Sequence, residues 1–290
     1  MKVRFVEAER AQHAVSLLCK AVGITPAGYY AARRRGVSLR ARRDVELAGL
    51  IRASWTQSRG TYGAPRVHAD LAAAGVGVSR KRVARLMAAD GLRGVTRRKW
   101  RTTIVDPAQP PAPDRVNRRF TASAPNRLWV ADITHVPTRQ GWLYLAIVMD
   151  TWSRRIVGWS MRDDLRAALA VDAVTMAITR RRPPSGLVHH SDRGSQYTSR
   201  DLATILATAQ ILPSMGRRGD AYDNAAAESC ISTIKNELAH QHPFTTKDHA
   251  RLAIFDYIET FYNTHRRHSK LGHKSPNEYE IINNHAATAA

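Results

Sequence analysis

Three acidic residues lie in three separate and distinctive segments of the chain. Asp132 lies in WVADITHV, Asp192 in HHSDRGSQYTS and Glu228 in DNAAAESCISTIKNEL, with 35 residues between the second acid and the third. A pair of divalent cations, held by carboxylates from distant parts of a chain, is a common means of cutting and rejoining a phosphodiester. The three acids together therefore predict a metal-dependent phosphoryl-transfer site.

The electrostatic cost of gathering these acids indicates what must bind between them. Two carboxylates about 4 Å apart repel by roughly 4 kcal/mol at an effective dielectric constant near 20. Asp132 also lies close to the apolar Val130 and Ile133, where an unpaired charge is costly. Oxygen ligands favour Mg²⁺, or Mn²⁺, so we expect a partly preformed site that the metal completes. Each acid taken alone is better explained as a surface residue or a helix cap.

The charge of the chain is large, positive and uneven. The 290 residues carry a net charge of +21, of which residues 1–119 hold +17, and 43% of all residues are hydrophobic. This balance favours nucleic acid as the partner ahead of an anionic membrane. The longest apolar run, Trp142 to Met149, is far shorter than the roughly 20 residues that span a bilayer. A protein that binds RNA through charge alone would explain the basic residues but not the three acids.

Two further features bear on the compartment. The N-terminus, MKVRFVEAER, lacks the apolar segment of a signal peptide. Cys19 and Cys230 have no neighbours of the kind that bind metal. We therefore expect a reduced, cytoplasmic protein without a disulfide framework or a zinc finger.

Two helical hairpins are predicted in the basic half. In residues 11–35, one helix ends at Gly23 and a second begins at Pro26, which is typical of a helix-turn-helix. In residues 60–92, Ser79 precedes a helix whose first turn is Arg80, Lys81 and Arg82. Recognition helices meet DNA with their N-terminal residues, so these three cations are candidate DNA contacts. The alternative is an ordinary helical hairpin with a solvated basic face.

A proline-rich segment divides the chain. Asp106 to Pro113 reads DPAQPPAP, which is typical of a stiff, extended linker. We therefore predict five segments, which are an N-terminal helical region at 1–58, a second helix-turn-helix at 59–100, a linker at 101–125, a catalytic core at 126–245, and a C-terminal helix and tail at 246–290.

Strand-like periodicity begins after the linker. Three consecutive strands are predicted at 128–136, 142–150 and 155–161, followed by alternating helices and strands, so the fold class is α/β with a mixed sheet flanked by helices. Asp132 lies within the first strand and Asp192 follows the strand at 187–190. Glu228 lies on a predicted helix at 223–240, where Asn224 and Lys235 share its face.

At these residues the sequence resembles the DDE transposases and retroviral integrases, whose core is ribonuclease-H-like. The similarity is greatest to second-frame (OrfB-type) transposases of bacterial insertion sequences of the IS-three family, and it covers about residues 10 to 280. The stretches that carry it are Trp129-Val130-Ala131-Asp132-Ile133-Thr134, His190-Ser191-Asp192-Arg193-Gly194-Ser195-Gln196-Tyr197, Asp223-Asn224 with Glu228 and Lys235, Tyr262-Asn263 with Arg266, Arg267, His268, Ser269 and Leu271, Ser275-Pro276 with Tyr279, and Tyr62-Gly63-Ala64-Pro65-Arg66-Val67 upstream.

The resemblance implies roles for particular side chains. Asp132, Asp192 and Glu228 would be the metal-binding catalytic triad. Lys235 matches a basic position that contacts DNA at the active site, although an exposed helix lysine is the simpler interpretation. The remaining candidates are Asn224, which would orient Glu228 or cap its helix, His190, which would support the site or pack in the core, and Gln196 and Tyr197, which would line the DNA path.

The resemblance also implies a reaction and partners. The reaction is strand cleavage at the end of an insertion sequence, followed by strand transfer. Related proteins act as a frameshift fusion with a first-frame protein that supplies a helix-turn-helix and a leucine zipper, and this chain is similar to the second frame alone. A homo-multimer would hold two DNA ends together in the bacterial cytoplasm, in association with the nucleoid. The alternatives are a non-catalytic basic DNA-binding regulator and a structure-specific nuclease of the same fold.

Overall fold

The N-terminal helices form a small apolar core of their own. A computed structural model of the chain describes residues 1–34, 38–95, 112–216, 224–241 and 243–288, without the side chains beyond 283. The first segment folds into α1 (Lys2–Glu9), α2 (Val15–Val22) and α3 (Pro26–Arg34). Gly23 ends α2 in the left-handed conformation, as predicted, whereas α1 was not predicted. The buried residues of this core are Val6, Leu18, Cys19 and Tyr29.

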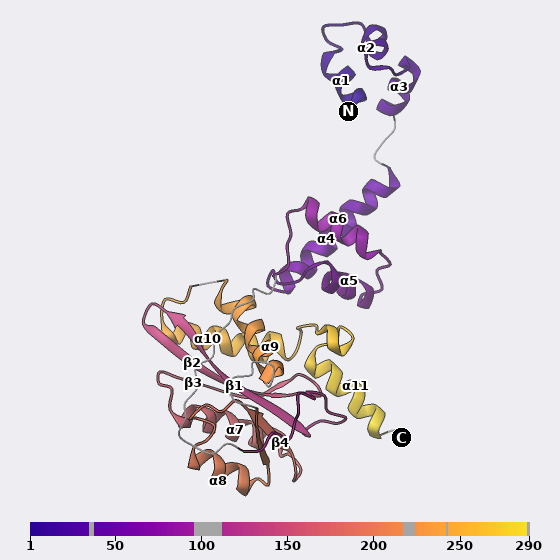
Figure 1. Ribbon diagram of the computed structural model, residues 1–290. Helices are drawn as coiled ribbons and strands as arrows, with labels where there is room; N and C mark the ends of the chain where they lie inside the picture. Colours follow the sequence, from indigo (N-terminus) through magenta and orange to yellow (C-terminus); the bar gives the residue numbers. More distant parts are fainter. Residues whose placement is uncertain (35–37, 96–111, 217–223, 242, 289–290) are drawn as a thin grey trace.

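Three more helices form the next unit (Figure 1). The predicted hairpin is present as α5 (Ala64–Ala73) and α6 (Arg80–Ala89), and the Ser79 hydroxyl caps α6 by accepting from the backbone N–H of Arg82 at 3.3 Å. A long helix that the sequence did not predict, α4 (Leu39–Gln57), packs against both. The segment boundary predicted at residue 58 therefore falls inside one packed unit, because α4 contributes Leu47 and Ile51 to the same core.

A five-stranded sheet forms the centre of the rest of the chain. The strand order is β3-β2-β1-β4-β5. The first three strands pair antiparallel, and β4 and β5 continue the sheet in parallel with β1, so the predicted mixed sheet is confirmed. The strands are β1 (Leu128–Thr138), β2 (Gly141–Asp150), β3 (Ile156–Arg162), β4 (Val188–Ser191) and β5 (Leu212–Met215).

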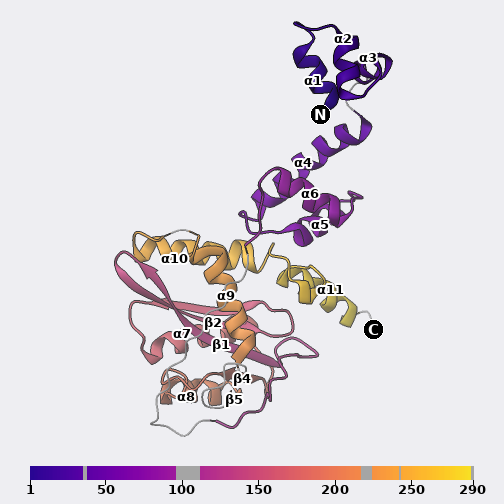
Figure 2. The ribbon, with the colours of Figure 1, turned by 45° about the horizontal axis from the view of Figure 1, so that its top comes forward.

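Helices cover both faces of the sheet, on opposite sides in Figures 1 and 2. One face packs against α7 (Ala167–Arg181) and α8 (Arg200–Thr208) through Trp129, Ala131 and Val148. The other face includes Val130 and packs against the helices that follow β5. Because side chains alternate along a strand, Asp132 lies on the same face as Val130.

Each of the two helices predicted after β5 changes its winding near its end. α9 (Ala225–Ile234) continues as the π-helix η2 (Lys235–Ala239), and α10 (Lys247–Asp256) continues as the π-helix η3 (Tyr257–Tyr262). Both pack on the sheet, so the packed core extends past the boundary predicted at residue 245. The chain then passes through η4 (Ser269–Leu271) and ends in α11 (Pro276–Thr288), which was not predicted.

Two remaining predictions concern the linker and the membrane. Residues 101–111 of the predicted linker lie outside the described residues. Farther along, the backbone N–H of Arg115 donates to the Ser214 hydroxyl of β5 at 2.9 Å, so this part of the segment is attached to the sheet. None of the described helices has the length and apolar character that a membrane crossing requires.

Candidate active site

The first two acids are brought together by the pairing of β1 with β4. These strands are parallel, with Leu128 opposite Val188 and Val130 opposite His190. Two residues further along the chain from this last pair lie Asp132 on β1 and Asp192, which is one residue beyond the end of β4. Neighbouring strands are about 4.8 Å apart, so sheet pairing accounts for the approach of two residues 60 positions apart in sequence. The Asp192 carboxylate accepts the backbone N–H of Gly194 at 3.0 Å, which orders the loop.

The third acid approaches from the helix above this face. Glu228 lies in the first turn of α9, which packs on β1. Asn224, at the start of that helix, makes no side-chain cap. Its amide instead donates to the carbonyl of Ala131 at 3.1 Å and fastens the beginning of α9 to the strand beside Asp132. The sequence had offered Asn224 as a cap or as a partner of Glu228, and the bond to β1 was not foreseen.

The other two carboxylates act electrostatically on Asp132. The pKa of Asp132 is raised well above its ordinary value, first by burial and then by the negative charge of Asp192, with a smaller contribution from Glu228. The backbone N–H of Ile133, which donates to Asp132 at 2.8 Å, and the charge of Lys235 oppose this rise. Asp192 as a whole residue is exposed to solvent. Its carboxyl group is nevertheless surrounded by protein atoms, and this burial raises the pKa of Asp192.

The acids do not form a closed ligand set by themselves. Within the described part of the chain, no group of three or more His, Cys, Asp or Glu side chains is close enough to hold a metal ion. The carboxylates therefore share one electrostatic field while their oxygens remain apart. The expectation of a partly preformed site that the metal completes stays a prediction.

Lys235 faces the strand that carries Asp132. It is the first residue of η2 and is half-buried. Burial lowers the pKa of Lys235, and Asp132 partly restores it, while the Lys235 charge also helps burial to lower the pKa of His135 on β1. These interactions favour a role at the site over the simpler interpretation as an exposed helix lysine.

The residues predicted to line the DNA path differ in exposure. Gln196 donates its amide to the carbonyl of Leu165 at 2.9 Å. Tyr197 is only 5% exposed because its ring packs with Leu202 and Leu206, so the ring cannot stack on a base. Its hydroxyl is buried with no hydrogen-bond partner among the described residues. Burial, and then the charges of Asp132 and Asp192, raise the pKa of Tyr197 well above its ordinary value.

Two histidines lie next to each other on β4. His190 is buried, contacts the Ser214 hydroxyl through Nδ1 at 2.9 Å, and packs edge-on against Phe120 at 5.8 Å, which agrees with the core-packing alternative. His189 was not singled out in the sequence. Burial, aided by the charge of His190, lowers the pKa of His189 to about 4.

The basic residues of α6 divide into two kinds. Arg80 and Lys81 are exposed, as a DNA contact requires. Arg82 instead donates to the carboxylate of Asp44 on α4 at 2.7 Å, and Arg85 shares that carboxylate at 2.6 Å. Arg82 is therefore occupied within the protein and is not available as predicted, because its partner lies on a helix that the sequence did not reveal.

Sequence reasoning also missed a buried ion pair on the side of η2 away from the acids. Glu237 lies two residues after Lys235 and pairs with Arg266, which is 4% exposed. Arg266 was among the residues quoted for the resemblance, and Glu237 lay in the segment quoted for the third acid. The signal that could have revealed them is a glutamate beside the apolar Leu238 and Ala239.

Comparison with known proteins gives matches along most of the chain. A family model described as an integrase core domain matches residues 122–221, and a second with the same description matches residues 209–276. A model described as an HTH-like domain matches residues 42–100.

Two similar proteins extend over nearly the whole chain. An uncharacterized 31 kDa protein of insertion element IS600 from Shigella sonnei is 42% identical over 260 residues, which are 89% of this chain and 96% of that protein. The transposase InsF for insertion sequence IS3A from Escherichia coli (strain K12) is 37% identical over 286 residues, 98% of this chain and 99% of that protein. Among solved structures, the HTLV-2 integrase catalytic core domain in complex with magnesium covers 54% of this chain and 97% of its own, at 19% identity and a TM-score of 0.41.

Proposed function

Because the chain belongs to the family of insertion-sequence transposases that includes InsF of IS3, we propose that Asp132, Asp192 and Glu228 are the catalytic acids of its strand cleavage and strand transfer. The observation that carries this assignment is the effect of Asp192 and Glu228 on the ionisation of Asp132. A carboxyl whose pKa is raised by two neighbouring carboxylates is stabilised in its charged form by a nearby cation, so metal binding would draw the three acids together.

The donor set fits Mg²⁺, or Mn²⁺. Asp132 bears the cost of burial and of two neighbouring negative charges, while Lys235 offsets only a part of that cost. Oxygen ligands with open positions between them suit these cations. Bound there, a pair of divalent cations would stabilise the leaving 3′-oxygen and lower the pKa of the attacking water or 3′-hydroxyl.

The residues of the chain have separate tasks in this proposal. The central strand β1 fixes Asp132, and the bond from Asn224 to the Ala131 carbonyl keeps α9 against that strand. Lys235 would contact a DNA phosphate beside the acids, and Gln196 would lie along the strand path. The exposed Arg80 and Lys81 on α6 would hold DNA outside the site through phosphate contacts.

The proposal extends to the partners. DNA is the substrate, both as the ends of the insertion sequence and as the target. Two ends have to be held together for joining, so a homo-multimer would assemble on them, with a first-frame protein, or a fusion to it, contributing end recognition. The reaction would take place on bacterial DNA in the cytoplasm, in association with the nucleoid.

Strand transfer from a pre-cut DNA end tests the assignment. With Mg²⁺ present, we expect Asp132→Ala, Asp192→Ala and Glu228→Gln each to abolish joining, while DNA binding followed by fluorescence anisotropy persists. Asp163→Asn, which alters an acid paired with Arg251 at the surface, is the control and should join normally. Substantial joining by any triad variant would overturn the assignment. Hydrolysis without joining by the wild type would favour the nuclease alternative, and no cleavage at all would favour the DNA-binding regulator.

A further inference from the structure

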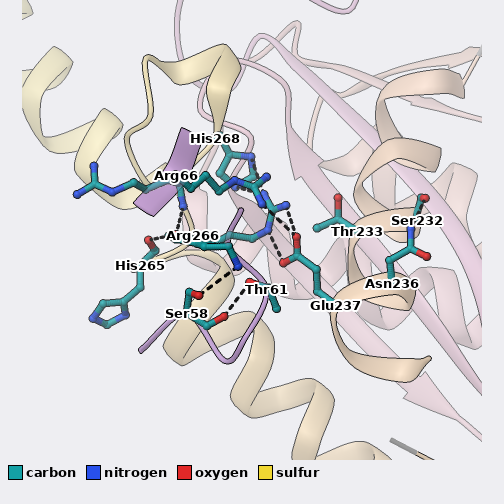
Figure 3. Close-up of polar contacts among 12 residues, drawn as sticks. Ser58, Thr61, Arg66, Ser232, Thr233, Asn236, Glu237, His265, Arg266 and His268 are labelled. Carbon is teal, nitrogen blue, oxygen red and sulfur yellow. Dashed lines mark hydrogen bonds and ion pairs between the residues drawn. The ribbon is translucent and has the colours of Figure 1, made fainter. Parts of the chain in front are cut away.

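A second charged cluster is buried beside the proposed active site (Figure 3). Glu237 receives two bonds from the guanidinium of Arg266, Nε to Oε2 at 2.7 Å and Nη2 to Oε1 at 2.6 Å. The Tyr257 hydroxyl donates to the same carboxylate at 2.8 Å. The two charged side chains are about 5% exposed, so the pair is almost completely removed from water.

Further contacts fix the positions of the charged groups in this cluster. Arg66, from α5, approaches the Glu237 carboxylate at 3.5 Å as a second cation. The Arg266 guanidinium also donates toward the ring of His268 at 3.3 Å, and that ring is therefore neutral. A planar, two-point contact between a guanidinium and a carboxylate fixes orientation as well as distance. Breaking it would leave an uncompensated buried charge.

Glu237 of this pair belongs to the same continuous helix, α9–η2, that carries the third proposed catalytic acid, Glu228. Glu228 and Glu237 are nine residues apart and have different partners, because Glu228 acts on Asp132 of β1 whereas Glu237 pairs with Arg266. Lys235 is seven residues from Glu228 and lies on its side of the helix. The helix α9–η2 therefore packs on β1 through one side, and it is bound to Arg266 through Glu237 on another.

The continuous helix α9–η2 changes from α-helical to π-helical winding at Lys235. The backbone N–H of His240 donates to the carbonyl of Lys235 at 2.8 Å, a spacing of five residues that defines a π-turn. Short π-segments are rare and often lie at functional sites, because they redirect the side chains that follow. The facing segment η3 is also π-helical and supplies Tyr257, so two such segments meet at Glu237.

The loop that carries Arg266 is also attached to the helical unit of α4–α6. The Tyr62 hydroxyl accepts the backbone N–H of Arg267 at 2.7 Å and donates to the carbonyl of His265 at 3.2 Å. Arg267 pairs with Asp70 on α5. A displacement of α5 would thus be transmitted to the Arg266 loop and, through Glu237, to the helix α9–η2.

We propose that the Glu237–Arg266 pair is a positioning element for strand transfer. The pair fixes the orientation of α9–η2 relative to the sheet, and therefore the positions of Glu228 and Lys235 relative to Asp132. Through Arg66 it also connects this orientation to the HTH-like unit. This inference rests on the proposed function of the triad. Neither residue touches DNA or metal in this role.

The experiment must separate positioning from simple stabilisation. Four variants of the full chain are compared with the wild type: Glu237→Gln, Arg266→Lys, the charge-free double variant Glu237→Gln/Arg266→Met, and the control Glu46→Gln. The control makes the same change in an exposed ion pair with Arg43 on α4. Each is tested for its unfolding temperature, its DNA affinity, and the kcat and KM of joining a pre-cut end, well below its unfolding temperature.

We expect both single variants to unfold at lower temperature and to lose joining at least tenfold in kcat, with DNA affinity changed less than threefold. The double variant removes both charges, so it should recover most of the lost thermal stability, because no buried charge is left unpaired. Its kcat should nevertheless stay at least tenfold below that of the wild type, because the two-point contact is absent. Glu46→Gln should match the wild type throughout.

Two outcomes would overturn the proposal. If kcat recovers together with the unfolding temperature in the double variant, the pair only stabilises the fold. If the single variants join at the wild-type rate, the helix α9–η2 is positioned by other contacts. Asp192→Asn in the same assay keeps these outcomes separate from failure of the triad assignment, since its retention of joining would count against the acids and not against the pair.

Discussion

Asp132 and Asp192 each follow, by two residues, one member of the parallel pair Val130 and His190, and the charge of Asp192 raises the pKa of Asp132. Their approach is built into the sheet, so the repulsion between them is present whenever the protein is folded. Their closeness therefore costs stability when no cation is bound.

Removing one of the proposed catalytic carboxylates should stabilise the metal-free protein. The folded pKa of Asp132 lies above its unfolded value, so its ionisation weakens the fold as pH rises through that interval, and the full cost is present at neutral pH. We expect Asp132→Asn to raise the free energy of unfolding at pH 7, because the buried charge and its repulsion from Asp192 are removed. Urea unfolding without metal measures this change.

The same variant should lose its response to the metal. Mg²⁺ should raise the unfolding temperature of the wild type and leave that of Asp132→Asn unchanged. Asp172→Asn, which alters an exposed pair with Arg162, should behave as the wild type in both measurements. A lower stability for Asp132→Asn without metal would contradict the electrostatic account.

The bond from Asn224 to β1 should matter more for joining than an equivalent bond elsewhere. Asn224→Ala removes a buried donor from the Ala131 carbonyl and should cost about 1–2 kcal/mol. Because the start of α9 is then less firmly held over Asp132, strand transfer should fall severalfold. Asn283→Ala removes a similar amide-to-carbonyl bond to Tyr279, at 2.8 Å in α11, and should leave joining unchanged. An equal loss of joining in both variants would argue against a local role.

His189 should make the protein sensitive to mild acid. Burial lowers the pKa of His189 to about 4 in the folded chain, whereas the imidazole takes up its proton near 6.5 when unfolded. Between these values the unfolded state binds the extra proton, so stability is lost as pH falls, at about 1.4 kcal/mol per pH unit and roughly 3 kcal/mol in all. Urea unfolding at pH 7, 6 and 5 should show a shallower decline for His189→Gln. Parallel curves would rule out this source of acid sensitivity.

Gly158 should be essential for packing α7 on the sheet. A Cβ at this position of β3 would lie 2.1 Å from the Ala173 carbonyl oxygen of α7, a contact that no side-chain adjustment can relieve. Gly158→Ala should therefore destabilise the protein by about 2 kcal/mol or more. Gly49→Ala on α4 meets nothing within 4 Å and should stabilise by about 0.5–1 kcal/mol. Thermal unfolding of both variants distinguishes crowding from a general effect of alanine.

The basic residues of α6 should differ in how much each contributes to the salt dependence of DNA affinity. Arg80→Ala and Lys81→Ala should each reduce the slope of log affinity against log salt by about 0.9, the value for one phosphate contact on duplex DNA. Arg82→Ala should leave the slope nearly unchanged and lower the unfolding temperature, because Arg82 is paired with Asp44. A reduced slope for Arg82→Ala would show that this ion pair opens on DNA.

The features that could be predicted from the sequence are those determined by residues close together in the chain. Apolar residues bounded by turn residues located β1 and β2 within two residues at each end, and the capping Ser79 located the start of α6. The acids were recognised because each sits in a distinctive local segment. The helix α4 was missed because charged and apolar residues do not alternate with a clear helical period along it.

Contacts between distant segments could not be predicted in this way. Arg82 looked available for DNA until its partner appeared on a separate helix, and Tyr197 looked exposed until α8 folded over its ring. The partners Arg66, Glu237 and Arg266 come from three segments about 30 to 200 residues apart. Such pairings are decided by tertiary packing, which no periodicity encodes. The catalytic roles of the acids, of Lys235 and of Gln196 stay predictions.

The apolar cluster that reaches from the HTH-like helices into the sheet limits how this protein can evolve. Leu47 and Val83 belong to the same cluster of buried residues as Met149 and Ile254. An exchange of the DNA-binding helices between two relatives would have to match both sides of this shared interior at once. The N-terminal helices α1–α3, whose interior is their own, could be exchanged between lineages far more freely.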